Sequence, residues 1–409
     1  MRVDGERMRR DFEALAAIGA TPEGGVDRPS LGDAHLAARR WFLECAEAYG
    51  LATRVDAAGN HSAVVPGDGP TLLLGSHLDS VRDGGRYDGA LGVVAALHVL
   101  VALREAELPL ALEAIDFTDE EGTLVGLLGS EALTGALSAE TLRNPRGGRE
   151  ALLAGLERAG LREEELCDAR RDTATLAAYL ELHIEQGPRL ERAGTQIGIV
   201  TGIVGARSYV LDFAGRSGHS GTTPMDARRD AGLAAAVFAV AANAIVVQAF
   251  PGCAATVGDM RFEPGDFNVI PGAVRVSLEF RSLDAAQLDA LEAALLHAAR
   301  AAAEQHALGV EITPVGHWTP TVLDEGVRKA IATAAEALGL AATELSSGAG
   351  HDAQALAGIV PSGMIFVPSS GGVSHNPHEH TAWDDCVNGA NVLLGAALEL
   401  CSAYAARGT

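Results

Sequence analysis

The sequence predicts an α/β protein, in which a mostly parallel sheet covered by helices carries an inserted, smaller α+β domain. Three observations lead to this prediction. From Thr71 to about Val200 short apolar runs alternate with helical stretches, a pattern typical of a parallel sheet. Near Gly202 the pattern changes to long helices and a strictly alternating strand. The chain of 409 residues also exceeds what one core usually organises. We therefore expect one domain from residues 1–203 and 318–409, and another from 204–317.

The larger domain is expected to begin with two helices, at Glu6–Ile18 and Asp33–Tyr49. A third helix, rich in Ala, Val and Leu, is expected at Gly89–Arg104. Four apolar runs that are too short for helices are interpreted as buried strands of one sheet. These runs are Thr71–Leu74, Ala111–Phe117, Leu176–Leu182 and Gly363–Val367.

The inserted domain is expected to contain two strands and two long helices in alternation. Apolar and polar residues alternate strictly along Ala273–Arg281, which predicts a strand with one buried face. The other expected elements are a strand at Ser208–Ala214 and helices at Asp226–Val247 and Ala285–Ala307. The longest apolar stretch, Ala231–Ala242, is too short to span a bilayer and is interpreted as a buried helix.

Composition excludes several classes of protein. The formal charge of 31 − 54 = −23 argues against nucleic acid and anionic membranes as partners. The first residues are too charged for a signal peptide. The five cysteines form no CxxC pair, so we expect reduced thiols and a soluble, cytoplasmic protein.

Polar clusters follow each of the four predicted strands. They contain the motifs GSHLDS (75–80) with YDG (87–89), TDEEG (118–122), HIEQGP (183–188) and SHNPHE (374–379). A glycine-rich turn with solvated carboxylates would explain any one of them. Because open α/β sheets place ligands at the carboxyl ends of their strands, one metal site explains all four together.

The same residues support a site for two divalent ions. Such a site needs a bridging carboxylate and about two further ligands for each ion. We take Asp88 as the bridge, and the remaining ligands are then His77, Glu121, His183 and His375. Glu120, adjacent to a ligand, is the candidate general base. An alternative is that Glu120 is an ordinary acid at a helix N-terminus.

Eight segments together resemble the hydantoinase/carbamoylase amidases of the M20 metallopeptidase class. This group includes N-carbamoyl-L-amino acid hydrolases and allantoate amidohydrolases, and the resemblance runs from about Gly24 to Asn391. HIEQGP is the most discriminating segment, because other M20 peptidases usually carry an acidic ligand in place of His183. The remaining segments are GSHLDSV (75–81), YDG, DEEG, SGHSGTTPM (217–225), NVIPG (268–272), SGAGHDA (347–353) and SHNPHE.

The resemblance implies a role for individual residues. One ion would bind Asp88, Glu121 and His375, and the other His77, Asp88 and His183. Asp79 would hold His77, Glu120 would act as base and then acid, and the inserted domain would be a lid and dimerisation domain. His219 would polarise the scissile carbonyl, often from the partner subunit. Contacts to the substrate carboxylate would come from Gln186, Asn268, Arg281 and Gly350.

From the residues alone, some alternatives stay open. His219 also fits an ordinary exposed turn, and Arg281 a solvated arginine, although a guanidinium suits a carboxylate well. With the resemblance, the expected function is metal-dependent hydrolysis of the ureido C–N bond of N-carbamoyl-L-amino acids, which releases ammonia, carbon dioxide and the amino acid. Alternatives are an allantoate amidohydrolase, an N-acyl-amino-acid deacylase or peptidase, and a non-catalytic binding protein. The metal could be Zn, Mn, Co or Ni, because a His/carboxylate site accepts all four.

Overall fold

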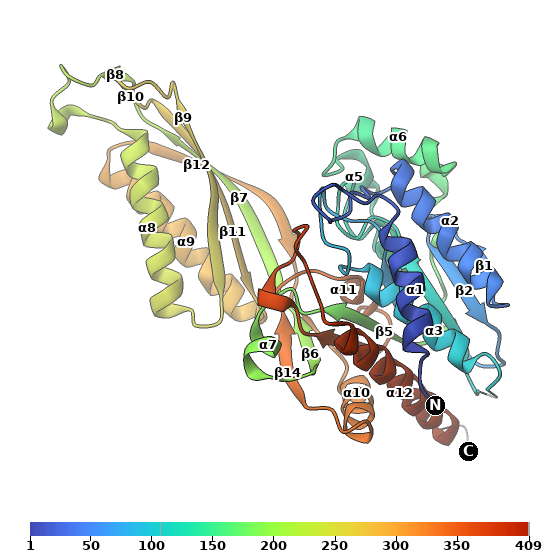
Figure 1. Ribbon diagram of the computed structural model, residues 1–409. Helices are drawn as coiled ribbons and strands as arrows, with labels where there is room; N and C mark the ends of the chain where they lie inside the picture. The colour runs from blue at the N-terminus through green and yellow to red at the C-terminus, as the bar shows by residue number, and fades with distance from the viewer. Residues whose placement is uncertain (107, 408–409) are drawn as a thin grey trace. The chain divides into compact units, whose positions relative to one another are not determined.

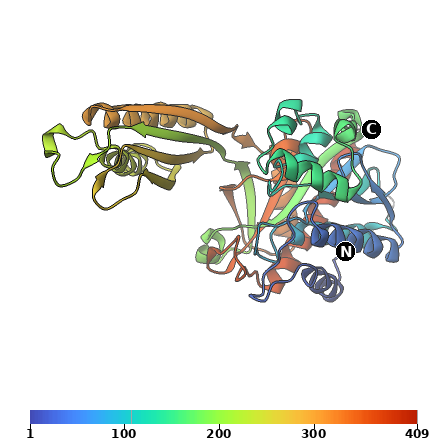
Figure 2. The same cartoon turned by 90° about the horizontal axis from the view of Figure 1, so that it is seen from above.

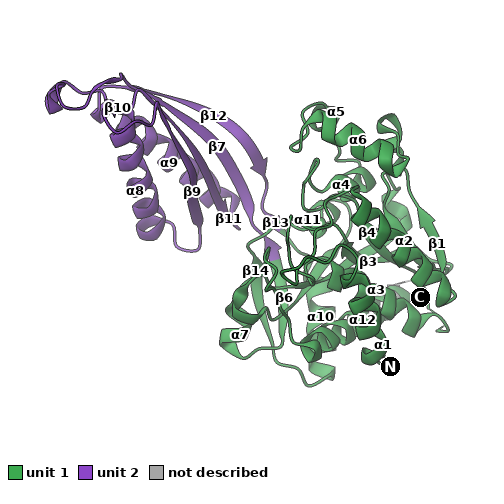
Figure 3. Ribbon diagram, turned by 45° about the horizontal axis from the view of Figure 1, so that its top comes forward, with its two compact units in different colours: residues 1–201, 322–409 green, residues 202–321 purple. Residues whose placement is uncertain are grey.

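A computed structural model describes residues 1–106 and 108–407. The chain divides into two compact units, one formed by Met1–Thr201 with Val322–Thr409 and the other by Gly202–Thr321 (Figure 3). Both chain termini belong to the larger unit (Figure 2).

The larger unit is built on a nine-stranded sheet in the order β1-β2-β4-β3-β5-β15-β6-β13, with β14 paired to β6 (Figure 1). The neighbouring strands β4, β3, β5 and β15 are parallel, and β1, β2 and β6 add antiparallel pairings. The strands are β1 (Ala52–Val55), β2 (His61–Val65), β3 (Thr71–His77), β4 (Ala111–Phe117), β5 (Leu176–Ile184), β6 (Ile197–Ile203), β13 (Thr321–Val322), β14 (Ala342–Ser347) and β15 (Ser362–Val367).

The α/β prediction is confirmed, because the four apolar runs of the sequence are the four parallel strands. Their side chains are buried almost without interruption, as expected for strands covered on both faces. The parallel register places the carboxyl ends of these strands along one edge of the sheet. Every polar cluster picked out in the sequence therefore begins at this edge.

Helices cover both faces of the sheet. The main core joins α1, α2, α3, α10 and α12 to one face, to which Leu72 and Leu74 of β3 point. On the other face α4 and α11 contact the strands, and a second apolar cluster ties α4 to α5 and α6. The helices are α1 (Gly5–Ala16), α2 (Asp33–Ala48), α3 (Ala90–Leu103), α4 (Leu128–Thr134), α5 (Ala139–Arg143), α6 (Arg149–Ala159), α7 (Arg189–Ala193), α10 (Glu325–Ala337), α11 (Asp352–Leu356) and α12 (Trp383–Arg407), with 3-10 turns η1 (Glu163–Ala169), η2 (Thr173–Thr175) and η4 (Ser370–Gly372).

The smaller unit has a four-stranded antiparallel sheet in the order β12-β7-β11-β9, and two helices share one apolar core with it. The sequence-based expectation of two strands is therefore wrong. Of the missed strands, β8 and β10 are only two residues long, and β9 and β12 contain no fully buried residue, so their apolar pattern is weak. The elements are β7 (Gly205–Ala214), β8 (Gly218–His219), η3 (Met225–Ala227), α8 (Ala231–Ala249), β9 (Ala254–Glu263), β10 (Val269–Ile270), β11 (Ala273–Ser282), α9 (Ala285–Gln305) and β12 (Gly309–Trp318).

Helix α8 begins five residues later than predicted, at Ala231, and is more exposed than its sequence suggested. Only about a third of the apolar stretch of α8 is buried in the folded chain. The expectation of a buried helix is therefore wrong for one side of α8. Leu233, Val240 and Val247 are 46%, 73% and 73% exposed, and their spacing of seven residues places them on one stripe. By length and composition alone, α8 and α12 could each cross a membrane, a test that core helices of soluble proteins also pass.

Candidate metal centre

The candidate ligands gather where β3 and β5 end side by side. The chain passes from β3 through α3 to β4 on one side, whereas β5 pairs with β3 on the other. Such a reversal of strand order opens a crevice at the carboxyl ends of the strands. His77 is the last residue of β3, and His183 lies near the end of β5. Asp88 lies two residues before the start of α3, and Gly89 caps the N-terminus of this helix.

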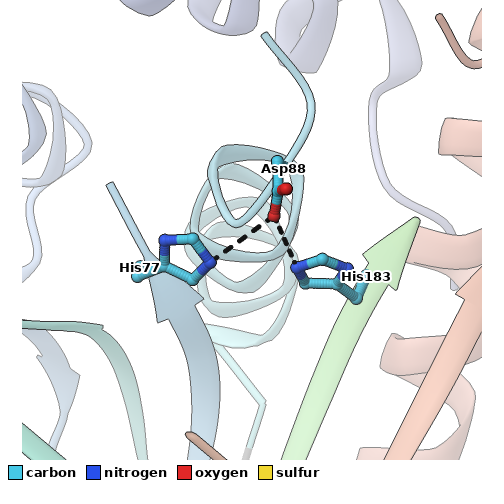
Figure 4. Close-up of side chains that lie close together, drawn as sticks. All are labelled: His77, Asp88 and His183. Atoms are coloured by element: carbon cyan, nitrogen blue, oxygen red, sulfur yellow. Dashed lines mark ion pairs between the residues drawn. The ribbon is translucent and has the colours of Figure 1, made fainter. Parts of the chain in front are cut away.

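The first group of candidate ligands consists of His77, Asp88 and His183, all buried and drawn in Figure 4. Oδ1 of Asp88 lies 3.6 Å from Nε2 of His77 and 3.0 Å from Nε2 of His183. Gly89 makes this approach possible, because a Cβ at that position would lie 2.4 Å from Cε1 of His77. Gly89 also has a φ of 62°, which glycine adopts without strain.

The tautomers of both histidines suit a metal. Nδ1 of His77 lies 3.0 Å from the carbonyl oxygen of Asp79, and Nδ1 of His183 lies 2.9 Å from that of Ile184. A carbonyl only accepts, so Nδ1 carries a hydrogen in each ring, and Nε2 is the ring atom left to bind a metal. The main-chain N–H of Gly89 points at Nε2 of His183 from 3.3 Å, which agrees with a lone pair there.

The second group of ligands uses the other oxygen of the same aspartate. Oδ2 of Asp88 lies 3.3 Å from Nε2 of His375, which in turn lies 3.6 Å from Oε2 of Glu121. The two oxygens of Asp88 thus face two different sets of donors. Asp88 and Glu121 are largely buried, whereas the side chain of His375 is 51% exposed.

Distances and charge both fit divalent ions. Ligands about 2.0–2.1 Å from a tetrahedral Zn²⁺ lie about 3.3–3.4 Å apart, close to the 3.0–3.6 Å separations in both groups. Burial and the nearby charge of Asp88 raise the pKa of Glu121 to about 8. Burial, followed by the charge of Glu121, also raises the pKa of Glu120 well above its usual range. Bound cations would stabilise the carboxylate forms of both groups.

Glu120 lies beside this site, in the loop after β4. Its Oε2 is 3.6 Å from Nε2 of His77. The alternative that Glu120 begins a helix is wrong, because the next helix, α4, starts only at Leu128. Asp79 holds the loop, since its two carboxylate oxygens accept the main-chain N–H groups of Glu120 and Glu121 at 3.3 and 3.2 Å. The shortest contact of Asp79 to His77 is through its carbonyl oxygen, and its carboxylate is 3.6 Å away.

Sequence reasoning missed several buried carboxylates around the ligands. Asp119 accepts the main-chain N–H groups of Leu124, Val125 and Gly126, and so shapes the loop that carries Glu120. Glu181 is buried in β5, where it accepts hydrogen bonds from Ser76, Tyr179 and the N–H of Ala353. The signal for Glu181 was available: a lone charge within the apolar run Leu176–Ile184.

The ring of His351 packs against the ring of His183. Its ring centre lies 4.5 Å from that of His183, edge to face, and its Nε2 is 2.8 Å from Oγ of Ser347. Glu181, His183 and His351 form a third cluster with metal-ligand spacing. Glu181 already accepts three hydrogen bonds, so we regard this cluster as support for His183.

Two predicted substrate residues belong to the larger unit. Nε2 of Gln186 donates to Oδ2 of Asp88 at 2.8 Å, so this side chain lies at the site. Its Oε1 is buried and has no hydrogen-bond partner among the described residues. Gln186 has a φ of 56°, and its N–H donates to Oγ of Ser369. Gly350 lies in the turn between β14 and α11, next to His351.

The other predicted substrate residues belong to the smaller unit, in two separate places. His219 and Asn268 lie together, because β8 pairs with β10 and the N–H of Ser220 donates to the carbonyl of Asn268. Arg281 lies at the far end of β11, paired with Ala206, and donates to Glu279. From Ala273 to Arg281, β11 extends about 27 Å at ~3.4 Å per residue.

Comparisons with known proteins agree over nearly the whole chain. A model of the peptidase family M20/M25/M40 matches residues 58–399. An N-carbamoyl-L-amino acid amidohydrolase of Geobacillus stearothermophilus is 37% identical over 97% of this chain and 99% of its own. An allantoate amidohydrolase of Bacillus subtilis is 34% identical over 91% of this chain and 92% of its own.

A solved structure extends the similarity to the fold. The crystal structure of a hydantoinase/carbamoylase family amidase from Burkholderia multivorans has a TM-score of 0.89 and 36% identity, covering 98% of both chains. The chain is therefore an enzyme, a hydrolase of carbon–nitrogen bonds. It belongs to the peptidase family M20/M25/M40 and, within it, to the hydantoinase/carbamoylase amidases.

Proposed function

We propose that the protein hydrolyses the ureido C–N bond of N-carbamoyl-L-amino acids. One observation carries the chemistry: the two oxygens of Asp88 face two different groups of ligands, with Glu120 beside the first. The substrate class is supported by the similarity to N-carbamoyl-L-amino acid amidohydrolases along nearly the full chain. The products would be ammonia, carbon dioxide and the free amino acid.

The residues would hold two divalent ions, one at His77, Asp88 and His183 and one at Asp88, Glu121 and His375. Zn, Mn, Co and Ni all suit these ligands. When bound, the ions would lower the pKa of water and polarise the carbonyl oxygen of the ureido group.

Glu120 would transfer the proton. As a carboxylate it would take one proton from the attacking water, while the water oxygen forms a bond to the carbamoyl carbon. It would then give that proton to the terminal nitrogen, the C–N bond would break and ammonia would leave. The remaining carbamate would lose carbon dioxide and give the amino acid. Asp79 would hold Glu120 in place through the main-chain N–H groups it accepts.

Arg281, Asn268, Gln186 and Gly350 would contact the substrate. A guanidinium pairs bidentately with a carboxylate, which suits Arg281 to the amino acid end. The buried Oε1 of Gln186 has no hydrogen-bond partner in the described part of the chain, so it is an acceptor for a ureido N–H. His219 would stabilise the negative charge that develops on the carbonyl oxygen.

The distance along β11 supports a dimer in which His219 acts on the partner subunit's substrate. Within one chain, His219 and Asn268 are separated from Arg281 by the length of β11, about 27 Å. A single small substrate cannot touch both ends. We therefore propose that the smaller unit is a lid and dimerisation domain, in which the exposed stripe of α8 (Leu233, Val240 and Val247) contacts a second copy.

Allantoate is the second candidate substrate, because an allantoate amidohydrolase is 34% identical over 91% of this chain. Allantoate also has ureido groups and a carboxylate, so the same residues could bind it. An N-acyl-amino-acid deacylase would use the same ligands on an acyl group. A non-catalytic role is disfavoured, since all five proposed ligands and Glu120 are present and close together.

Ammonia release by the Mn-loaded protein distinguishes these substrates. N-carbamoyl-L-methionine should be cleaved at the highest kcat/KM, and a chelator should abolish the reaction. A preference for allantoate would assign that substrate instead. Release of acetate from N-acetyl-L-methionine, without ammonia release from either ureido compound, would contradict the proposal and support the deacylase.

A further inference from the structure

Glu379 is a buried carboxylate that touches the segments of two proposed ligands without belonging to either ligand group. It is 3% exposed and follows His375 in the loop between η4 and α12. Its Oε1 accepts the main-chain N–H groups of Tyr87 and Asp88 at 2.9 and 3.0 Å. Its Oε2 accepts the hydroxyl of Ser374 at 2.9 Å.

The absence of a side chain at Gly85 leaves room for the carboxylate of Glu379. A Cβ at Gly85 would lie 2.0 Å from Cδ of Glu379, so any other residue at position 85 would displace it. Glu379 thus connects the turn Gly85–Asp88, which follows β3, to the distant loop of Ser374 and His375. Both segments lack regular secondary structure, so no sheet or helix fixes their separation.

Through Ser374, the hydrogen bonds of Glu379 extend to a carboxylate oxygen of Asp88. The hydroxyl of Ser374 lies 3.3 Å from Oδ2 of Asp88, the oxygen that faces His375. His375 needs such support more than the other ligands do. Its side chain is 51% exposed and its backbone φ is 53°, in the left-handed region that non-glycine residues rarely adopt.

We propose that Glu379 is a positioning residue that sets the separation of Asp88 and His375 and thereby the affinity of the second metal group. The proposal rests on the metal centre described under Proposed function. Residues that orient metal ligands typically contribute about 10–100-fold to metal affinity. Because Glu379 acts through two main-chain amides and a hydroxyl, the length of its side chain should matter more than its charge.

Three variants separate length from charge. Glu379→Ala removes all three hydrogen bonds. Glu379→Asp keeps the charge but is one methylene too short to reach both amides. Glu379→Gln keeps the length, and its carbonyl oxygen can still accept both N–H groups. Asp56→Ala is the matched control, because Oδ1 of Asp56 also accepts two main-chain N–H groups, of Ala58 and Asn60, in the β1–β2 turn.

The measurement is calorimetric titration of the metal-free proteins with Zn²⁺, with folding checked by circular dichroism. The wild type should bind two ions. In Glu379→Ala and Glu379→Asp one of the two sites should lose about 10–100-fold in affinity, and Glu379→Gln and Asp56→Ala should bind both ions within about threefold of the wild type. If Glu379→Ala does not fold, the comparison of the Zn²⁺ affinities of Glu379→Asp and Glu379→Gln still tests the inference.

Two results in the Glu379 variants would overturn the inference: wild-type affinity in Glu379→Asp, or a loss in Glu379→Gln as large as in Glu379→Asp. An equal loss in Asp56→Ala would also overturn it, because the effect would then be one of general destabilisation. A wild type that binds no ion would instead contradict the proposed metal centre. The two failures are therefore distinguishable.

Discussion

Arg281 lies near one end of the long strand β11 and His219 lies beyond the other end, although both are expected to contact one small substrate. Arg281 pairs with Ala206 at the end of the sheet where the chain enters and leaves the smaller unit. His219 pairs with Val269, a few residues before β11 begins. The two residues can meet one substrate only if they come from different subunits.

Mixing two inactive variants tests this arrangement. Arg281→Ala and His219→Ala should each lose most activity as pure dimers. Co-expressed in equal amounts, they should regain about a quarter of the wild-type rate, because half of the dimers would be mixed and each would contain one intact site. The rate of ammonia release by the purified mixture measures this. No recovery from mixed dimers, verified by differential tagging, would contradict a contribution of His219 in trans.

A charge on the exposed stripe of α8 should separate the subunits. Val240→Asp should give a monomer by light scattering. Its unfolding free energy in the monomeric state should change by less than about 0.5 kcal/mol, because Val240 is 73% exposed in the single chain. Activity should fall with the dimer. Leu153→Asp, at an exposed leucine of α6, is the control and should remain dimeric. A dimeric Val240→Asp would show that the subunits meet elsewhere.

Glu120→Gln should separate metal binding from turnover. The amide keeps the shape of the side chain but cannot take a proton from water, so kcat should fall by ~10²–10⁴-fold. Metal content, measured by atomic emission after dialysis, should match the wild type, because Glu120 belongs to neither ligand group. A fully active Glu120→Gln variant would remove this residue from the mechanism.

His61 should make the folded protein sensitive to acid. Burial, helped by the positive charge of Arg39, lowers the pKa of His61 to about 3, from 6.5 in the unfolded chain. As pH falls below about 6.5, the unfolded chain takes up a proton that the folded chain does not, so stability is lost. His61→Gln should reduce that loss by up to about 1.4 kcal/mol per pH unit between pH 6.5 and 4.

Urea unfolding at several pH values measures the effect of His61. His297→Gln, at an exposed histidine of α9, is the control and should leave the slope of stability against pH close to that of the wild type. An unchanged slope in His61→Gln would show that other groups govern the loss.

The fold of the larger unit could be predicted because its strands carry an unambiguous signal. A strand covered on both faces is apolar throughout, as in Thr71–His77, and the polar motifs begin where each run ends. The smaller unit was harder. In β9, Ala254–Glu263, no residue is fully buried, so the hydrophobic pattern that predicted β11 is lacking.

The clustering of the candidate ligands could be predicted better than the contacts that hold them in place. His77 and Asp88 stand in a recognisable motif, but Glu379 and Asp119 act on main-chain amides, which have the same chemistry in every sequence. Their partners follow only from the folded chain. The exposed side of α8 was missed for a related reason: a helix that is apolar all round does not show which side its own chain leaves uncovered.

Anomalous diffraction from crystals of the Mn-loaded protein tests the central claim most directly. We predict two anomalous peaks in each subunit, one beside each carboxylate oxygen of Asp88, with His77 and His183 at the first and Glu121 and His375 at the second. A single peak, or two peaks with Asp88 bound to only one of them, would contradict the bridging role of Asp88 and with it the proposed two-metal hydrolysis.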